Sequence, residues 1–539
     1  MALEGINFFP TFGSMGPMAK RSILRAFLSS SLGTGLSRLL GLVRELAIAR
    51  VLGASAASDA FFMAFTIPSM FRRFVADEGL TGALVPLVAK AEAEEGTGAA
   101  KALAGRTFTA LAGLCVLVSL VAIPAAPWLV DLFASGFRAE PEKFALTVQL
   151  TRVMMPFVLF VSLVSWCEGL LNHRDHFFVP KIAPGLVSAA IVVAALWPGS
   201  GDPQAIVHTL AWAVLVGGLA HLLLCLPPLV KHWGVIRPRL DLWAGKRFRI
   251  LTAEMGKVAA IGLMAQVNVV VLRSLASHLQ TGSVSWYWNA TRLVDFAQGI
   301  IAVGVGSALL PAIAAAVAEE DWVEFRRSFG RAVGLAASLL FPAAAFVLLL
   351  APPFVAVLYR HGAYGWSDVE QTSSALRWLV PYMLALAGIQ IVKKPFFALN
   401  RRNSLVVVGA LGVGLTFVAG VLLAPRFGVD GLAAALSIST VGQLAAYLYL
   451  LGRITNGRLG LLALAGPLGR IAIATLPAAA AGWGLCLLGD WEQGPTLVNL
   501  AVFAVAGAAG GGLYLGAAWM LGIHEVHDVV ARVRGRLGR

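Results

Sequence analysis

The sequence predicts an all-α polytopic membrane protein with about 14 transmembrane helices. Apolar residues make up 58% of its 539 residues, charged residues only 13%, and the mean hydropathy is +0.80. Apolar runs of roughly 20 residues recur from end to end, enough to cross a hydrocarbon core of about 30 Å. Between these runs, connections rich in Lys and Arg alternate with connections that are poor in them.

The alternation of charge predicts sidedness, because short cytoplasmic loops carry the excess of Lys and Arg. The basic connections lie at 90–106, 173–174, 231–249, 326–331, 401–402, 453–458 and in the tail from 532. The charge-poor connections lie at 53–59, 136–143, 197–202, 280–283, 359–368, 425–430 and 489–495. Membrane topology thus accounts for the net charge of +14, and no nucleic-acid partner is expected. Both termini are predicted to be cytoplasmic.

The predicted spans follow from this order of runs and connections. They begin near residues 27, 58, 106, 145, 179, 205, 253, 284, 328, 372, 404, 430, 466 and 496. The first run is too long and too charged for a signal peptide and lacks a small-residue cleavage site, so it is expected to be retained. The connection at 231–252 mixes Trp, Phe and Arg and is typical of an interfacial segment.

An internal repeat relates spans one to six to spans seven to twelve. Ala126-Pro127 recurs as Ala351-Pro352, Pro156 as Pro381, Pro86 as Pro311, and Glu94-Glu95 as Glu319-Glu320, all at one constant offset along the chain. Because six is even, the halves cross the membrane in the same direction, as parallel repeats. Transporters built this way hold substrate between their halves and rock them for alternating access.

The predicted organisation has six parts. These are a cytoplasmic N-terminal segment (1–26), an N-lobe with spans one to six (27–230), a cytoplasmic interfacial linker (231–252), a C-lobe with spans seven to twelve (253–452), a C-terminal helix pair with spans 13 and 14 (453–521) and a basic cytoplasmic tail (522–539).

No enzyme motif is present, so a transporter is expected. The chain has no GxxxxGK[ST] phosphate loop and therefore no built-in ATPase. His524 and His527 in the tail do not form an HExxH motif, and no metal site or cofactor is predicted. The driving force is then expected from an ion gradient, the membrane potential or the substrate gradient.

Arginines inside apolar runs are the candidate site residues. Arg38 and Arg44 stand in the first run with nothing local to neutralise them, Arg72 and Arg73 end the second, and Arg292 lies within the eighth. A charged side chain at mid-bilayer costs roughly 3 kcal/mol, so several of them indicate a water-filled path or a polar ligand. Arginine is the natural partner of a phosphate or diphosphate, because its fork donates two parallel hydrogen bonds.

Polar neighbours share helix faces with these arginines. Ser37 precedes Arg44 by seven residues, and Ser285 precedes Arg292 by seven, so each pair falls on nearly one face. Asp295 follows Arg292 by three residues, and this pair either ties helices together or orients the arginine for a ligand.

Two further acidic positions accompany the second span. Arg73 and Asp77 are four residues apart and are able to pair, and Asp59 sits at the outer start of the span. The alternatives to a ligand-binding role for the arginines are inter-helix ion pairs and snorkelling to the interface.

The motifs R-x-L-G-x-x-R, S-D-A-F-F-x-A-F and P-x-x-x-R-R carry a family resemblance. They stand in SRLLGLVRELAIARVLGASAASDAFFMAFTIPSMFRRFVADEG, and a second similar segment is GSVSWYWNATRLVDFAQGIIAVGVGSALLPAIA. From about Ser29 to the last span the chain resembles the MurJ (MviN) family. These are the lipid II flippases of bacterial peptidoglycan synthesis, in the multidrug/oligosaccharidyl-lipid/polysaccharide exporter superfamily. The resemblance implies two six-helix lobes and two extra C-terminal helices.

The resemblance also implies roles for residues. Substrate-binding roles fall to Arg38, Arg44, Arg72, Arg292, Ser37 and Ser285, and supporting or gating roles to Asp59, Arg73, Asp77, Glu78 and Asp295. Relatives often have Glu after R-R-x-x-A, where this chain has Asp77-Glu78, so the role falls to one of the two. Some relatives hold sodium with an acidic residue in span eleven, but this span has no carboxylate here.

The leading hypothesis is a lipid II flippase of the bacterial inner membrane, with membrane lipids and peptidoglycan synthesis proteins as further partners. One alternative is an exporter of another polyprenyl-diphosphate-linked oligosaccharide. A cation-coupled drug exporter is a second, but it should place carboxylates where this chain has arginines. A non-transporting scaffold or receptor is the third, and it predicts that Arg44 and Arg292 tolerate neutral replacement.

Overall fold

The structure is a computed structural model that describes residues 17–75, 78–197, 201–241, 246–306, 309–399, 401–455, 457 and 460–523. Every regular element in these ranges is helical, which confirms the all-α class. The helices of the first half are α1 (Pro17–Leu52), α2 (Ala56–Val75), α3 (Glu78–Glu95), α4 (Thr97–Ala122), α5 (Ala126–Ala134), η1 (Ser135–Ala139), α6 (Pro141–Met154), α7 (Phe157–His173), α8 (Phe178–Ile182), α9 (Gly185–Leu196) and α10 (Pro203–Trp233). The others are α11 (Lys246–Ser277), α12 (Ser283–Gly306), α13 (Leu309–Ala318), α14 (Trp322–Tyr359), α15 (Trp366–Trp378), α16 (Val380–Ala398), α17 (Arg402–Ile454), α18 (Leu462–Cys486), η3 (Trp491–Gln493) and α19 (Leu497–Met520).

Each predicted span start lies in one of these helices, or one residue before α19. In the described chain, eight helices are long and apolar enough to cross a membrane, or nine if α15 and α16 count as one bent span. The count of 14 therefore stays a prediction. One reason for the lower number is α17, whose 53 residues fold back at Gly428 (φ 58°, ψ −133°). The arginine-bearing α1, α2 and α12 are not among the eight.

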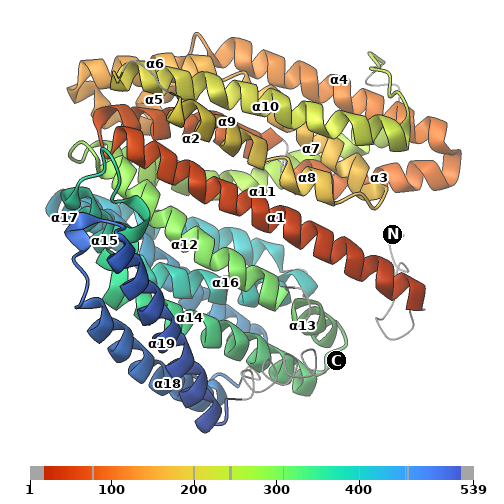
Figure 1. Ribbon diagram of the computed structural model, residues 1–539. Helices are drawn as coiled ribbons and strands as arrows, with labels where there is room; N and C mark the ends of the chain where they lie inside the picture. The colour runs from red at the N-terminus through yellow and green to blue at the C-terminus, as the bar shows by residue number, and fades with distance from the viewer. Residues whose placement is uncertain are drawn as a thin grey trace.

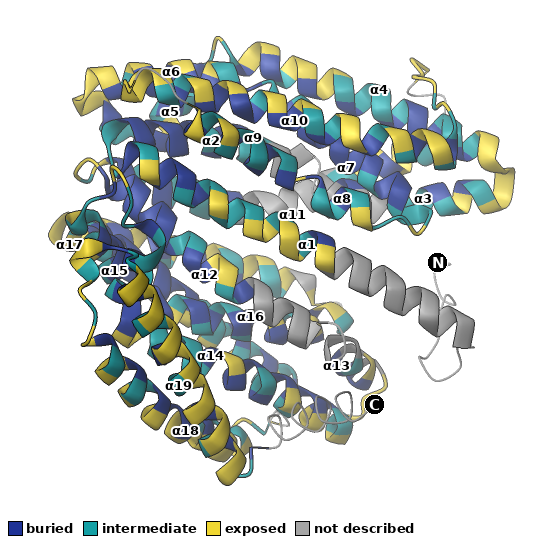
Figure 2. Cartoon of the chain, viewed as in Figure 1, coloured by how far each residue is buried: buried dark blue, intermediate teal, exposed yellow. Residues whose placement is uncertain are grey.

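Two helical bundles form the body of the molecule (Figure 1). Helices α1–α10 form one, here named the N-lobe, and α11–α17 form the other, the C-lobe; the two meet at the left of the view. The last two helices, α18 and α19, pack on each other and on α14. The outer helices expose many apolar side chains, Trp128, Leu120 and Met520 among them, which suits a surface that faces lipid (Figure 2).

The repeat extends to individual hydrogen bonds. Arg152 of α6 donates through Nε to the Ile123 carbonyl at 3.3 Å, where the chain passes from α4 to α5. Arg377 of α15, its counterpart at the repeat offset, donates in the same way to the Leu348 carbonyl at 3.0 Å, beside the kink of α14 at Leu350. A helix break leaves carbonyls without an intrahelical partner, so each arginine stabilises a break.

Candidate functional site

The two lobes touch at the predicted outer end, which carries the charge-poor connections. We name this contact the outer seal. It comprises Arg50, Gly53, Ser58, Asp59, Ser135, Gly136 and Lys143 of the N-lobe with Ser274, Ser277, Thr281, Gly282, Ser285, Gly362 and Ala363 of the C-lobe. The predicted inner end is the opposite end, with the basic connections.

Backbones approach each other closely in the outer seal. The amide of Ala363 donates to the Arg50 carbonyl at 2.9 Å. Gly53 (φ +58°) leaves no room for a side chain, since a Cβ there would lie 2.5 Å from the Ala363 oxygen. A Cβ on Gly362 (φ +57°) would lie 2.2 Å from the Arg50 oxygen. Glycine is required at both positions by conformation and by space.

Asp59 caps a helix of the opposite lobe. This fully buried residue lies in the first turn of α2 and accepts hydrogen bonds from the Gly282 amide at 2.7 Å and the Ser285 amide at 2.9 Å. The Ser285 hydroxyl donates to it at 2.6 Å and also contacts the Ser58 hydroxyl at 2.8 Å. A carboxylate at a helix N-terminus meets free amides and a favourable dipole, so Asp59 ties α2 to α12.

Arginines of both lobes converge below the seal on one carboxylate. Glu45 of α1 is 1% exposed and pairs through Oε1 with Arg44. The same oxygen lies 3.8 Å from Nε of Arg292 on α12. Its second oxygen accepts a hydrogen bond from Trp288 Nε1 at 3.1 Å. The prediction that nothing local neutralises Arg44 is therefore wrong, because the adjacent glutamate folds onto it.

The Trp288 indole packs against this cluster. The guanidinium carbons of Arg292 and Arg273 lie 4.3 Å and 4.5 Å from its ring centre, within cation–π range. Phe62 of α2 stacks on the indole at 4.9 Å. Because Phe62 belongs to the N-lobe and Trp288 to the C-lobe, the stack joins the lobes beside the arginines.

Arg292 keeps part of its hydrogen-bonding capacity. Its side chain is 34% exposed, against 15% for Arg44. Asp295 lies 3.4 Å from its Nη1, which confirms the predicted contact, but this carboxylate is 52% exposed. A half-exposed guanidinium with loosely held partners is able to turn toward an incoming anion.

The other predicted residues lie apart from this cluster or outside the described side chains. Ser37 is half-buried and Arg38 exposed on α1, closer to the inner end than Arg44. The side chains of Arg72, Arg73 and Glu78, and the whole of Asp77, lie outside the described part of the structure.

The segment predicted to lack a sodium ligand holds a neutral network. In α17 the Thr416 hydroxyl donates to the Gly412 carbonyl at 3.0 Å and to the Ser439 hydroxyl at 2.7 Å, joining the two halves of the helix. Gln443 reaches the same Ser439 hydroxyl at 3.4 Å. These groups carry no charge, so they do not fit a carboxylate-based cation site. In the described part of the chain, no group of three or more His, Cys, Asp and Glu could hold a metal.

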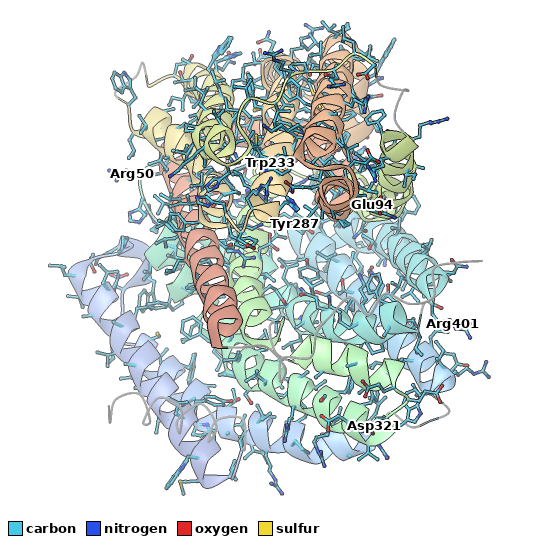
Figure 3. The ribbon with its side chains drawn as sticks, turned by 90° about the vertical axis from the view of Figure 1, so that its right-hand side faces the viewer. Arg50, Glu94, Trp233, Tyr287, Asp321 and Arg401 are labelled. Carbon is cyan, nitrogen blue, oxygen red and sulfur yellow. The ribbon has the colours of Figure 1, made fainter. Side chains whose placement is uncertain are left out.

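Ion pairs with exposed carboxylates lie at the inner end, where α11 packs on α3 (Glu94 is labelled in Figure 3). Arg247, at the start of α11, contacts Glu94 and Glu95 of α3 at 2.5 Å each. Arg106 of α4 donates to Asp241 of the linker at 2.5 Å. This hydrogen bond holds the pKa of Asp241 below its usual range.

Glu45, Lys143 and the seal glycines are the residues that sequence reasoning missed. Glu45 carried a signal, since a glutamate inside the first apolar run stands next to Arg44. Lys143 carried none, because it stands at the end of a predicted outer connection, where a solvated charge is ordinary.

Comparison with known proteins identifies the family of the chain. The model of the family described as "Lipid II flippase MurJ" matches residues 48–501. "Lipid II flippase MurJ" of Burkholderia cenocepacia is 33% identical over 445 residues, covering 81% of this chain and 84% of the relative. "Probable lipid II flippase MurJ" of Vibrio cholerae is 27% identical over 436 residues, covering 79% and 82%.

Solved structures show the same fold. One described as "Lipid II flippase MurJ, inward closed conformation" aligns with a TM-score of 0.75 at 17% identity, covering 93% of this chain and 99% of that one. An inward-facing "multidrug resistance MATE family transporter of the MOP superfamily" aligns with a TM-score of 0.61 at 16% identity, covering 81% and 99%. On the match to the family model and the identity to its members, this chain belongs to the MurJ lipid II flippase family.

Proposed function

We propose that this chain moves lipid II from the inner to the outer leaflet of the bacterial cytoplasmic membrane by alternating access. One observation carries the proposal: Arg44 of the N-lobe and Arg292 of the C-lobe meet at the buried Glu45 between the lobes. Two guanidiniums on opposite lobes form a site whose geometry depends on how the lobes are arranged.

The diphosphate of the cargo would compete with Glu45 for these guanidiniums. Each phosphate offers oxygens for bidentate arginine contacts, and such charge-assisted bonds are roughly twice as strong as neutral ones. An anion held by Arg44 and Arg292 together would bind some lobe arrangements better than others. A ligand shifts a conformational equilibrium only through such a difference in affinity.

The closed outer seal supports entry of the headgroup from the inner side. In this state the polyprenyl tail would remain in lipid beside α18 and α19, whose outward faces are apolar. Opening of the seal would then expose the headgroup on the outer side.

Several roles in this scheme are proposals that rest on the sequence. Arg38, Arg72 and Ser37 would extend the cargo-binding surface, and Ser285, buried in the closed seal, would join it when the seal opens. Asp59, Arg73, Asp77, Glu78 and Asp295 would support or gate it. Both termini would be cytoplasmic. The membrane potential would assist, because moving one charge is worth roughly 2.3 kcal/mol per 100 mV.

Complementation of a strain depleted of its own lipid II flippase tests the proposal. Wild type is expected to restore growth, and Arg44→Ala and Arg292→Ala to lose it at matched membrane abundance. Arg377→Ala is the matched control, since this arginine contacts a backbone carbonyl at a helix break and should retain rescue.

Each other outcome has a distinct meaning. Rescue by both Arg44→Ala and Arg292→Ala would overturn the arginine mechanism and favour the non-transporting scaffold. Failure of well-expressed wild type would favour a different polyprenyl-diphosphate-linked cargo. Purified protein in vesicles with fluorescent lipid II would then separate these cases, by showing whether the labelled headgroup reaches the opposite leaflet.

A further inference from the structure

Lys143 is a buried lysine in the outer seal that the proposed cycle has not used so far. It lies in the first turn of α6, and its side chain is only 3% exposed. Lysine is almost never fully buried unless it is paired. Its buried charge therefore requires partners within the seal.

The Lys143 amine has partners on both lobes. Nζ lies 3.2 Å from Oδ2 of Asp59 and donates to Glu140 Oε1 at 3.4 Å, both in the N-lobe. It also donates to the Thr281 hydroxyl of the C-lobe at 3.2 Å. The amine lies 4.4 Å from the centre of the Phe137 ring, within cation–π range.

The partners of Asp59 divide differently. Its three neutral donors, the Gly282 amide and the amide and hydroxyl of Ser285, all belong to the C-lobe. Its positive partner, Lys143, belongs to the N-lobe. When the lobes separate, the neutral donors leave and outer water reaches both charges. Only in the closed seal are the two charges desolvated and dependent on each other.

We propose that Lys143 is a positioning residue that holds the outer seal closed. It neutralises the buried Asp59 carboxylate that caps α12, and it binds the C-lobe directly through its hydrogen bond to Thr281. The contribution is specific to the closed state, because in the open state water solvates both ions. Removal of Lys143 alone therefore favours the open state, and removal of both charges restores part of the balance. The inference rests on the proposed alternating access.

A disulfide across the seal measures the closed population without any cargo. The hydroxyls of Ser135 and Ser274 lie 3.4 Å apart on opposite lobes, so Ser135→Cys with Ser274→Cys places two thiols in reach. The four native cysteines, Cys115, Cys167, Cys225 and Cys486, are all buried and are first replaced by alanine. The rate of oxidant-driven disulfide formation in membranes is then compared between variants.

Lys143→Met is expected to slow disulfide formation by about tenfold or more, because a buried carboxylate loses its counter-charge. Methionine keeps an unbranched stem that packs on Phe137. Asp59→Asn should also slow disulfide formation. The double variant Lys143→Met with Asp59→Asn should form the disulfide faster than either single variant. Lys181→Met is the matched control. That lysine pairs with Glu168 within the N-lobe, away from the seal, and its loss should leave the rate unchanged.

Crosslinking of Lys143→Met at the wild-type rate would overturn the proposal. The proposal would also be overturned if the double variant lost as much crosslinking as the two single variants lose in sum, because independent residues show no coupling. If Lys143→Met does not accumulate in the membrane, Thr281→Val is tested instead. It removes the C-lobe partner of Lys143, together with the hydrogen bond from Thr281 to Glu140, and leaves the Asp59 pair intact. Disulfide formation at the wild-type rate in Thr281→Val would show that the hydrogen bond between Lys143 and Thr281 does not hold the lobes together. Since the assay contains no lipid II, its outcome is separate from whether the cargo is lipid II.

Discussion

The outer and inner ends of the molecule hold their lobes together by different means. At the outer end, a buried carboxylate, a buried lysine and close backbone contacts join the lobes. At the inner end, Arg247 joins α11 to Glu94 and Glu95, whose side chains are 50% and 59% exposed. Exposed ion pairs contribute about 0–1 kcal/mol, whereas breaking a buried pair by removing one partner costs roughly 3–5 kcal/mol.

This difference indicates where the free energy of the cycle is stored. The ion pairs of the inner end exchange protein partners for water at little cost, although α11 also packs on α3 and buries Phe248 and Leu251 in its first two turns. The outer contacts are satisfied only while the lobes touch, and their loss must be offset by another interaction. Cargo that binds Arg44 and Arg292 more tightly when the seal is open is able to supply it.

The largest expected effect comes from breaking the outer backbone contact. Gly53→Val places a side chain where the Ala363 oxygen lies 2.5 Å from the Cβ, on a residue with φ +58°. We expect loss of the disulfide between the cysteines of Ser135→Cys and Ser274→Cys, and loss of growth rescue. Gly113→Val is the control, since nothing lies within 4 Å of a Cβ there. Equal crosslinking by the two variants would mean that the seal does not depend on close backbone approach.

An intermediate effect is expected at the central cluster. Glu45→Gln keeps an acceptor for Trp288 but removes the negative charge shared by Arg44 and Arg292. We expect a short-chain polyprenyl diphosphate to bind about tenfold more tightly, or roughly 1.4 kcal/mol, because it no longer competes with a carboxylate. Titration of purified protein measures this. Unchanged or weaker binding would show that Glu45 orients the arginines rather than competing with the ligand.

The smallest effect is expected at the inner end. Arg247→Ala removes both ion pairs with α3, and we expect less than about a twofold change in growth rescue or in seal crosslinking. A loss as large as that of Gly53→Val would remove the contrast between the two ends. It would place a second gate at the cytoplasmic face.

Much of the fold was predictable, because it depends on patterns that are local in sequence. Apolar run length and loop charge predicted span starts that fall in helices, and the constant offset of the repeat reappears in the Arg152 and Arg377 hydrogen bonds. Helix breaks were harder to predict. The fold-back at Gly428, for example, divides a helix whose apolar sequence continues through it.

The candidate site was predictable only where residue type implied chemistry. Intramembrane arginines and Asp295 stood out because a charge in lipid is costly. Glu45 was overlooked as an ordinary helix residue, although it lies between the arginines of both lobes. Lys143 and Gly362 matter through what stands opposite them in space. Such juxtapositions across lobes have no counterpart in the spacing of residues along one helix.

The paired arginines at the helix breaks have a consequence for ancestry. Arg152 and Arg377 make the same contact in each half, as expected if both halves descend from one duplicated segment. The cluster is matched in part: Arg44 and Arg273 each stand nine residues before a glycine with positive φ, Gly53 and Gly282, and Arg273 contacts the Trp288 ring of the cluster. The two halves thus share one cluster arginine as well as the helix break, whereas Ser274 stands where the first half has the carboxylate of Glu45.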